Sequence, residues 1–71
     1  MIFTAREIML LARQVVRPDG CFHPSELIPL VMQRCRIGRR QAKQIVEQWA
    51  REGDDTPPED RTMFWQIDQL H

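Results

Sequence analysis

The positions of apolar residues along the chain predict three helices, and the first is the clearest. Its apolar residues recur at i, i+3, i+4 and i+7, which places them on one face of an α-helix. Thr4 and Glu7 stand at the spacing of a capping box, in which each side chain accepts a hydrogen bond from the other residue's backbone. We therefore predict a helix over about residues 5–16, closed by turn residues at 18–20. Its buried face comprises Ile8, Leu11, Ala12 and Val15.

The second predicted helix, over residues 25–35, carries a proline near its start. His23 precedes Pro24 and is therefore biased toward extended backbone, and either His23 or Ser25 can cap the helix. Pro29 would cost about 3 kcal/mol in a helix interior but much less in a first turn. We expect the regular helix to begin late or to bend at Pro29. Its buried face comprises Leu27, Leu30, Val31 and Cys35.

The third predicted helix, over residues 39–52, buries one apolar stripe and presents a polar face rich in Arg, Lys and Gln. Ile37 in the preceding turn suits insertion into the core, and Gly38 suits the position that caps the helix. Gly53 stands where a glycine commonly ends a helix. Two helices joined by so short a turn form a helix-turn-helix. The apolar stripe comprises Ala42, Ile45, Val46 and Trp49.

The C-terminal segment permits two interpretations. Residues 62–67 alternate apolar and polar positions and are rich in residue types that favour strands. Such a strand can pair with a short extended piece at 21–23 and close a small sheet over the helices. The spacing of Met63, Ile67 and Leu70 also fits a helix over about 57–70. We favour the strand, in which Met63 and Ile67 face inward.

The aromatic residues follow from the same interpretation. Trp49 and Phe64 are assigned to the core rather than to base stacking. Trp65 faces inward if the segment is a strand, and is an exposed anchor for a partner if the segment is a helix.

The length and elements indicate one domain spanning residues 1–71, mainly α with a small β element. The alternative is an all-α domain with a fourth, C-terminal helix. No apolar run is long enough to cross a bilayer and no signal region is evident, so we expect a cytoplasmic protein with no membrane contact. Cys21 and Cys35 are expected to be buried thiols. With His23 they fall short of a four-ligand zinc set, and we expect neither metal nor cofactor.

The zero net charge conceals a segregation along the chain. Residues 1–53 carry nine Lys and Arg against five Asp and Glu, a balance of +4, whereas residues 54–71 carry one Arg against five acids, a balance of −4. The run from 34 to 43 contains five cations and no acid. A basic cluster on a neutral protein indicates a local anionic partner.

The order of elements resembles the winged helix-turn-helix family of DNA-binding domains, and among its members the small single-domain bacterial, plasmid and phage regulators. The resemblance covers nearly the whole chain and rests on residues 20–27, 36–45 and 61–67. The segment 54–62, which would form the wing, is acidic, whereas the wings of that family are usually basic. By position, the resemblance implies contact of the third helix with the major groove and of the turn with a phosphate. The residues so implied are Arg34, Arg36, Arg39, Arg40, Gln41, Lys43 and Gln44.

These observations predict a DNA-binding transcriptional regulator or accessory factor, acting as a dimer or by cooperative binding because operators usually contain two half-sites. The alternative is a protein-interaction module of winged-helix fold, such as a phage or plasmid factor that binds a host protein through residues 54–71. A third hypothesis comes from residues 15–27, which are similar to the Asp-Gly turn and following Glu of all-helical tellurite-resistance-type domains, where acids gather around a cation. We do not expect an enzyme, because the sequence shows no nucleophile setting and no phosphate-binding glycine loop.

Overall fold

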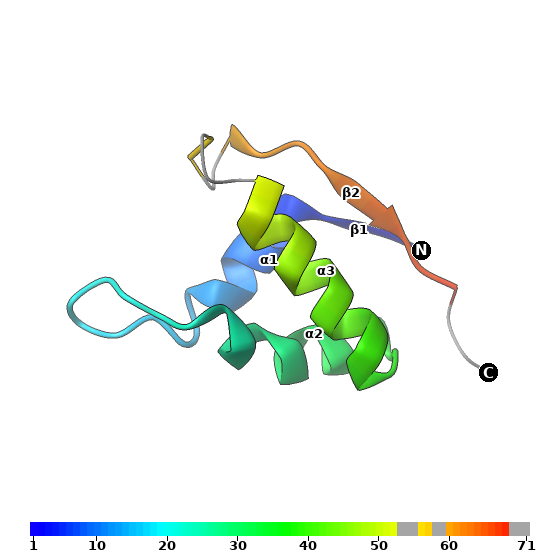
Figure 1. Cartoon of the computed structure of the whole chain (residues 1–71), viewed down its shortest axis with the longest axis horizontal. Helices are drawn as coiled ribbons and strands as arrows, with labels where there is room; N and C mark the ends of the chain where they lie inside the picture. The colour runs from blue at the N-terminus through cyan, green and yellow to red at the C-terminus, as the bar shows by residue number, and fades with distance from the viewer. Residues whose placement is uncertain (53–55, 58–59, 69–71) are drawn as a thin grey trace.

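The computed structural model describes residues 1–52, 56–57 and 60–68. Within them the chain forms three α-helices, one 3-10 helix and a two-stranded antiparallel sheet (Figure 1). This arrangement confirms the mainly α class with a small β element. The elements in chain order are β1 (Ile2–Thr4), α1 (Ala5–Ala12), η1 (Pro24–Leu27), α2 (Ile28–Cys35), α3 (Arg39–Glu52) and β2 (Phe64–Gln66).

Helix α1 begins at its predicted capping box and ends earlier than predicted. The Thr4 hydroxyl accepts from the Glu7 backbone N–H, and the Glu7 carboxylate accepts from the Thr4 N–H. The regular helix stops at Ala12, four residues before the predicted end, and a turn follows at 13–15. Val15 and Val16 are β-branched, and Arg17 precedes Pro18. Each of these features disfavours another helical turn.

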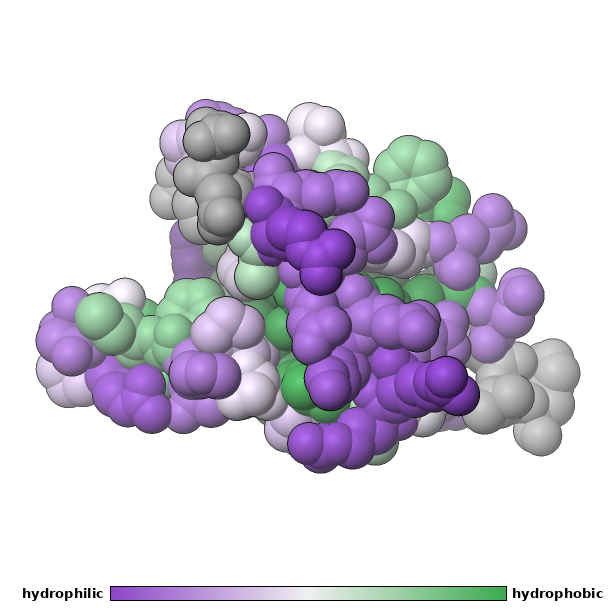
Figure 2. All heavy atoms as spheres, in the orientation of Figure 1, coloured by the Kyte–Doolittle hydropathy of each residue, from purple (hydrophilic) through white to green (hydrophobic). Residues whose placement is uncertain are grey.

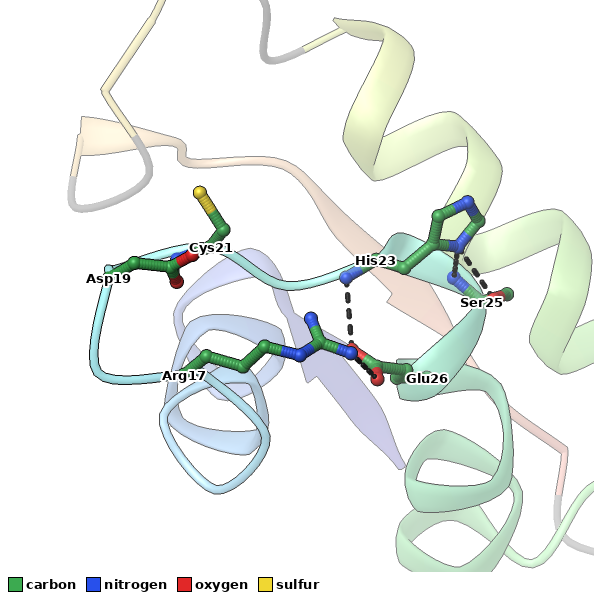
Figure 3. Close-up of polar contacts among 6 residues, drawn as sticks. All are labelled: Arg17, Asp19, Cys21, His23, Ser25 and Glu26. Atoms are coloured by element: carbon green, nitrogen blue, oxygen red, sulfur yellow. Dashed lines mark hydrogen bonds and ion pairs between the residues drawn. The ribbon is translucent and has the colours of Figure 1, made fainter.

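The entry to α2 is a short 3-10 helix capped by His23. The imidazole Nδ1 of His23 accepts from the Ser25 N–H, while the Glu26 carboxylate accepts from the His23 N–H at 2.9 Å (Figure 3). The α-helix itself begins only at Ile28, so Pro29 lies in its first turn, where a missing N–H leaves no hydrogen bond unmade. The expected late start is therefore confirmed.

A three-residue turn, 36–38, separates α2 from α3. Arg36 ends α2 in the left-handed conformation, with φ at 55°, and Ile37 is buried as predicted. The Ala42 N–H donates to the Gly38 carbonyl, which makes Gly38 the cap of α3. Helix α3 has its predicted bounds and packs across α2 and η1. The predicted terminating residue, Gly53, lies outside the described residues.

The predicted pairing of the C-terminal strand with residues 21–23 is wrong. Strand β2 pairs with β1 and not with residues 21–23, which form no strand; Phe3 stands opposite Trp65 in the register. Residues 21–23 are held in a local loop instead, where the Cys21 carbonyl accepts from the Arg17 N–H. A strand at 64–66 also shows that the fourth-helix alternative is wrong for the described residues 60–68.

The core lies between the helices and the inner face of the sheet. Trp49 and Ile67 are buried as predicted, Met63 is half-buried, and Trp65 is half-buried with its ring 6.3 Å from that of Phe3. The assignment of Phe64 to the core is wrong, because strand alternation turns it outward beside buried neighbours and leaves it 64% exposed. Cys35 is buried, but Cys21 is exposed in the loop before η1, which corrects that prediction.

Candidate nucleic-acid interface

The outward face of α3 is polar along its whole length. Figure 2 shows hydrophilic side chains gathered over α3 on the face turned to the viewer. The opposite stripe is buried in the core, as predicted from its spacing. All five residues that the sequence placed on this helix for DNA contact are exposed: Arg39, Arg40, Gln41, Lys43 and Gln44.

The start of α3 carries three cations without an ionic partner. Among the described residues, Arg36, Arg39 and Arg40 are exposed and form no ion pair. The first turn of α3 contains no acid. The N-terminus of a helix already carries a partial positive charge, so arginines here weaken the helix slightly and add to the positive field. This end of the helix is therefore suited to an anionic partner.

Two of the predicted site residues are instead engaged with acids. Arg34 lies on α2 and its guanidinium is 3.1 Å from the Glu7 carboxylate on α1. Lys43 lies 4.0 Å from Glu47, one turn along α3. Both pairs are exposed and contribute little stability. Arg34 therefore joins α1 to α2, and Glu47 divides the basic start of α3 from its second half.

One flank of α3 faces β2, a neighbour that the sequence did not indicate. The indole N–H of Trp65 donates to the Gln48 side-chain oxygen at 2.8 Å. Beside this hydrogen bond, an open hollow of about 180 Å³ lies between α3 and β2. No local pattern in the sequence could have revealed this contact, because it joins residues 17 positions apart through tertiary packing. Its walls include Gln41, Gln44, Gln48, Trp65 and Gln66.

The end of α3 is tied to the segment that leads into β2. The Arg61 guanidinium lies over the Trp49 ring at 4.4 Å and donates to the Trp49 carbonyl at 3.2 Å. The Arg61 side chain therefore has a structural role, because it holds the segment before β2 against the end of α3. Three of the acids that sequence analysis placed in the wing, at positions 54, 55 and 59, lie outside the described residues.

The loop proposed for a cation is held together by its own hydrogen bonds. Asp19 accepts from the Cys21 N–H, and Glu26 accepts from Arg17 at 2.7 Å (Figure 3). Across the part of the chain that the structure describes, no three His, Cys, Asp or Glu side chains gather as a metal site would require. The acids of this loop therefore have structural partners.

The buried thiol of Cys35 lies at the end of α2, next to the turn. Burial raises the pKa of this thiol; the nearby Arg34 opposes the shift and Glu7 adds to it. A thiol kept protonated in this way is a packing group, because the thiolate is the reactive form.

No family model, curated protein or solved structure matches the chain. Within the described residues, no helix has the length and apolar character needed to cross a membrane.

Proposed function

We propose that this protein binds duplex DNA through the outward face of α3, as a transcriptional regulator or accessory factor. The observation that carries the proposal is a group of three exposed arginines around the first turn of α3, Arg36, Arg39 and Arg40, that form no ion pair with any described residue. Phosphates supply most of the affinity of DNA-binding proteins, and unpaired cations meet them without first breaking an ion pair.

The roles of individual residues follow from their chemistry. On a specific site Arg39 and Arg40 can each direct a planar guanidinium to the O6 and N7 of a guanine, and Gln44 can form two hydrogen bonds with an adenine. On a mixed-sequence duplex the same two arginines contact phosphates instead. Arg36, in the turn, can hold a phosphate and so fix the register of the helix on the duplex. In this proposal α2, the turn and α3 act as a helix-turn-helix, as in the winged-helix family.

The sheet takes no part in the proposed DNA contact. A winged helix would use the hairpin after its recognition helix, whereas β2 here pairs with β1 and bonds to α3 through Gln48. The three acids at positions 54, 55 and 59 would also repel phosphates in that segment. The proposal therefore rests on α3 and the turn alone.

The test compares two double variants with equal charge change. Arg39→Ala/Arg40→Ala removes two cations from the proposed face, and Arg6→Ala/Arg13→Ala removes two exposed cations from α1 and the turn after it, neither of them ion-paired among the described residues. Binding to a fluorescent mixed-sequence duplex is measured by anisotropy at several salt concentrations. Each phosphate contact contributes about 0.9 to the slope of log K against log salt.

We expect the α3 variant to bind at least about tenfold more weakly at low salt, with a slope smaller by roughly 1.8. The control variant should retain the wild-type slope to within about half a unit. Equal losses of DNA affinity in both variants would show that the protein is held to DNA by general charge attraction and not by α3. Absence of binding by the wild-type protein at low salt would refute the proposal.

A further inference from the structure

Strand β2 has one edge whose backbone groups have no partner among the described residues. In an antiparallel ladder, alternate residues direct N–H and C=O groups toward the neighbouring strand and away from it. The bonds from Ala5 to Met63 and from Ile67 to Met1 show that odd-numbered residues of β2 face β1. Phe64 and Gln66 therefore direct their N–H and C=O groups away from β1. Strand β2 lies at the margin of the molecule (Figure 1).

The strand pair and the residue just before β1 together carry most of the exposed large apolar side chains among the described residues. Three of the five such residues among the described ones belong to this region: Met1, Ile2 and Phe64. Ile2 and Phe64 are each more than 60% exposed and lie diagonally on the outer face of the sheet. Natural edge strands usually carry lysine, proline or a bulge that prevents pairing. Residues 62–67 contain no charged residue and no proline.

We propose that this edge of β2 pairs with the same edge of a second copy of the chain. Antiparallel pairing about a twofold axis at Trp65 places Phe64 of one copy opposite Gln66 of the other. Each such pair exchanges two hydrogen bonds, so all four outward groups of each copy gain a partner. The two sheets become one four-stranded sheet, and the outer face gains a continuous apolar surface.

The chemistry of the strand favours a second copy over a different partner. When an uncharged strand pairs with a second copy of itself, no like charges face each other. A different protein partner is commonly selected by opposite charge, and residues 62–67 carry no charge for such a selection. Pairing about a twofold axis also closes, so no free β2 edge remains for further growth. Two three-residue strands bury far less than the about 1,200–2,000 Å² of a stable interface, so we expect weak association that depends on concentration.

Pairing of this kind would set the orientation of the two α3 helices. In a continuous sheet the inner faces of both copies lie on the same side. Trp65 points inward from β2 and bonds to α3, so both α3 helices would lie on that side as well. The inference stands whether or not the protein binds DNA, because the pairing uses only β1 and β2.

The experiment is sedimentation equilibrium of the protein alone, from about 10 µM to about 1 mM, a span that covers weak interfaces. We expect the weight-average mass to rise from 8.5 kDa toward twice that value. Phe64→Lys places like charges across the interface and should remain monomeric throughout. Leu10→Lys changes another exposed apolar residue, on α1, and should associate as the wild type does.

A backbone variant separates strand pairing from simple apolar contact. Gln66→Pro removes an outward N–H that β1 does not use, a position where edge strands tolerate proline. It should weaken association at least about tenfold, since two cross-copy hydrogen bonds are lost, while Gln66→Ala retains the N–H and should associate normally. Circular dichroism checks that each variant is folded.

A wild-type protein that remains monomeric at about 1 mM would refute the inference and leave the apolar face to a different protein. Association that Gln66→Pro leaves unchanged would equally refute strand pairing. DNA binding is measured separately on the monomeric Phe64→Lys protein, so failure of either proposal is recognised independently of the other.

Discussion

The outward face of α3 and the outer face of the sheet are opposite in character although they belong to a chain of only 71 residues. The first carries exposed arginines that form no ion pair with the described residues, and the second carries Ile2 and Phe64 and no charged residue. A neutral total charge therefore hides two surfaces of different chemical character. Charge attraction is long-ranged and sensitive to salt, whereas apolar contact is short-ranged and insensitive to it. Each surface can accordingly be tested under conditions that silence the other.

The largest expected effect comes from removing the core residue on which the sheet rests. Phe3→Ala deletes a fully buried ring opposite Trp65 and should destabilise the protein by about 3–5 kcal/mol in urea unfolding. Ile2→Ala, one residue earlier and exposed, should cost less than about 0.5 kcal/mol. If the Phe3→Ala protein were as stable as Ile2→Ala, the sheet would not share a core with the helices.

A smaller effect should follow from removing an acid from the polar face of α3, which makes that face more basic. Glu47→Gln removes the acid beside Lys43 and should raise affinity for duplex DNA by up to about fivefold at low salt, in the range of one screened charge interaction. Anisotropy titrations measure this change. Glu52→Gln removes the same charge at the far end of α3 and serves as the control; an equal gain there would mean that contact extends over the whole helix.

The hydrogen bond that links α3 to the sheet should contribute modestly to stability. Gln48→Ala removes the acceptor of the Trp65 indole N–H, and we expect a loss of about 0.5–1 kcal/mol because the bond is exposed. The Trp65 indole signal in an amide NMR spectrum should move at the same time. Gln44→Ala, an exposed neighbour with no hydrogen bond to a described side chain, should leave both stability and that signal unchanged.

The smallest effect concerns the pH dependence of stability near the turn. Burial raises the pKa of the Cys35 thiol in the folded state, so the folded protein holds this proton more tightly than the unfolded chain. The resulting stabilisation is complete below the unfolded pKa and is lost as pH rises through the folded pKa. Urea unfolding between pH 7 and 10.5 should show a decline in the alkaline range that Cys35→Ala lacks and Cys21→Ala retains.

Local patterns in the sequence predicted the elements that depend on neighbouring residues. The capping box at Thr4, the apolar stripe of α3 and the late start of α2 at Pro29 are all written within a few positions. Burial of the α3 stripe also leaves the predicted polar residues on its surface. The burial of the turn residue Ile37 was also predicted correctly, because it is a single apolar residue in a basic turn.

Long-range pairing was not predictable from such patterns. The N-terminal strand has only three residues, and its partner lies about 60 positions away. The segment 21–23 has equally suitable residues, but in the structure the Cys21 carbonyl accepts from the Arg17 N–H instead of joining a strand. The exposure of Phe64 follows from the same register, because pairing with β1 fixes which side of β2 faces inward.

The hydrogen bond from Ile67 to Met1 also has a consequence for the order of events during folding. A contact between such distant positions must close a loop that contains all three helices, and the entropy of closure is recovered only after those helices have packed. We expect the sheet to form last and to open first. In hydrogen-exchange experiments the amides of Phe3 and Trp65 should then lose protection before those in the middle of α3. During synthesis, this sheet cannot close until residues 64–67 have left the ribosome, so the helices spend that interval without it.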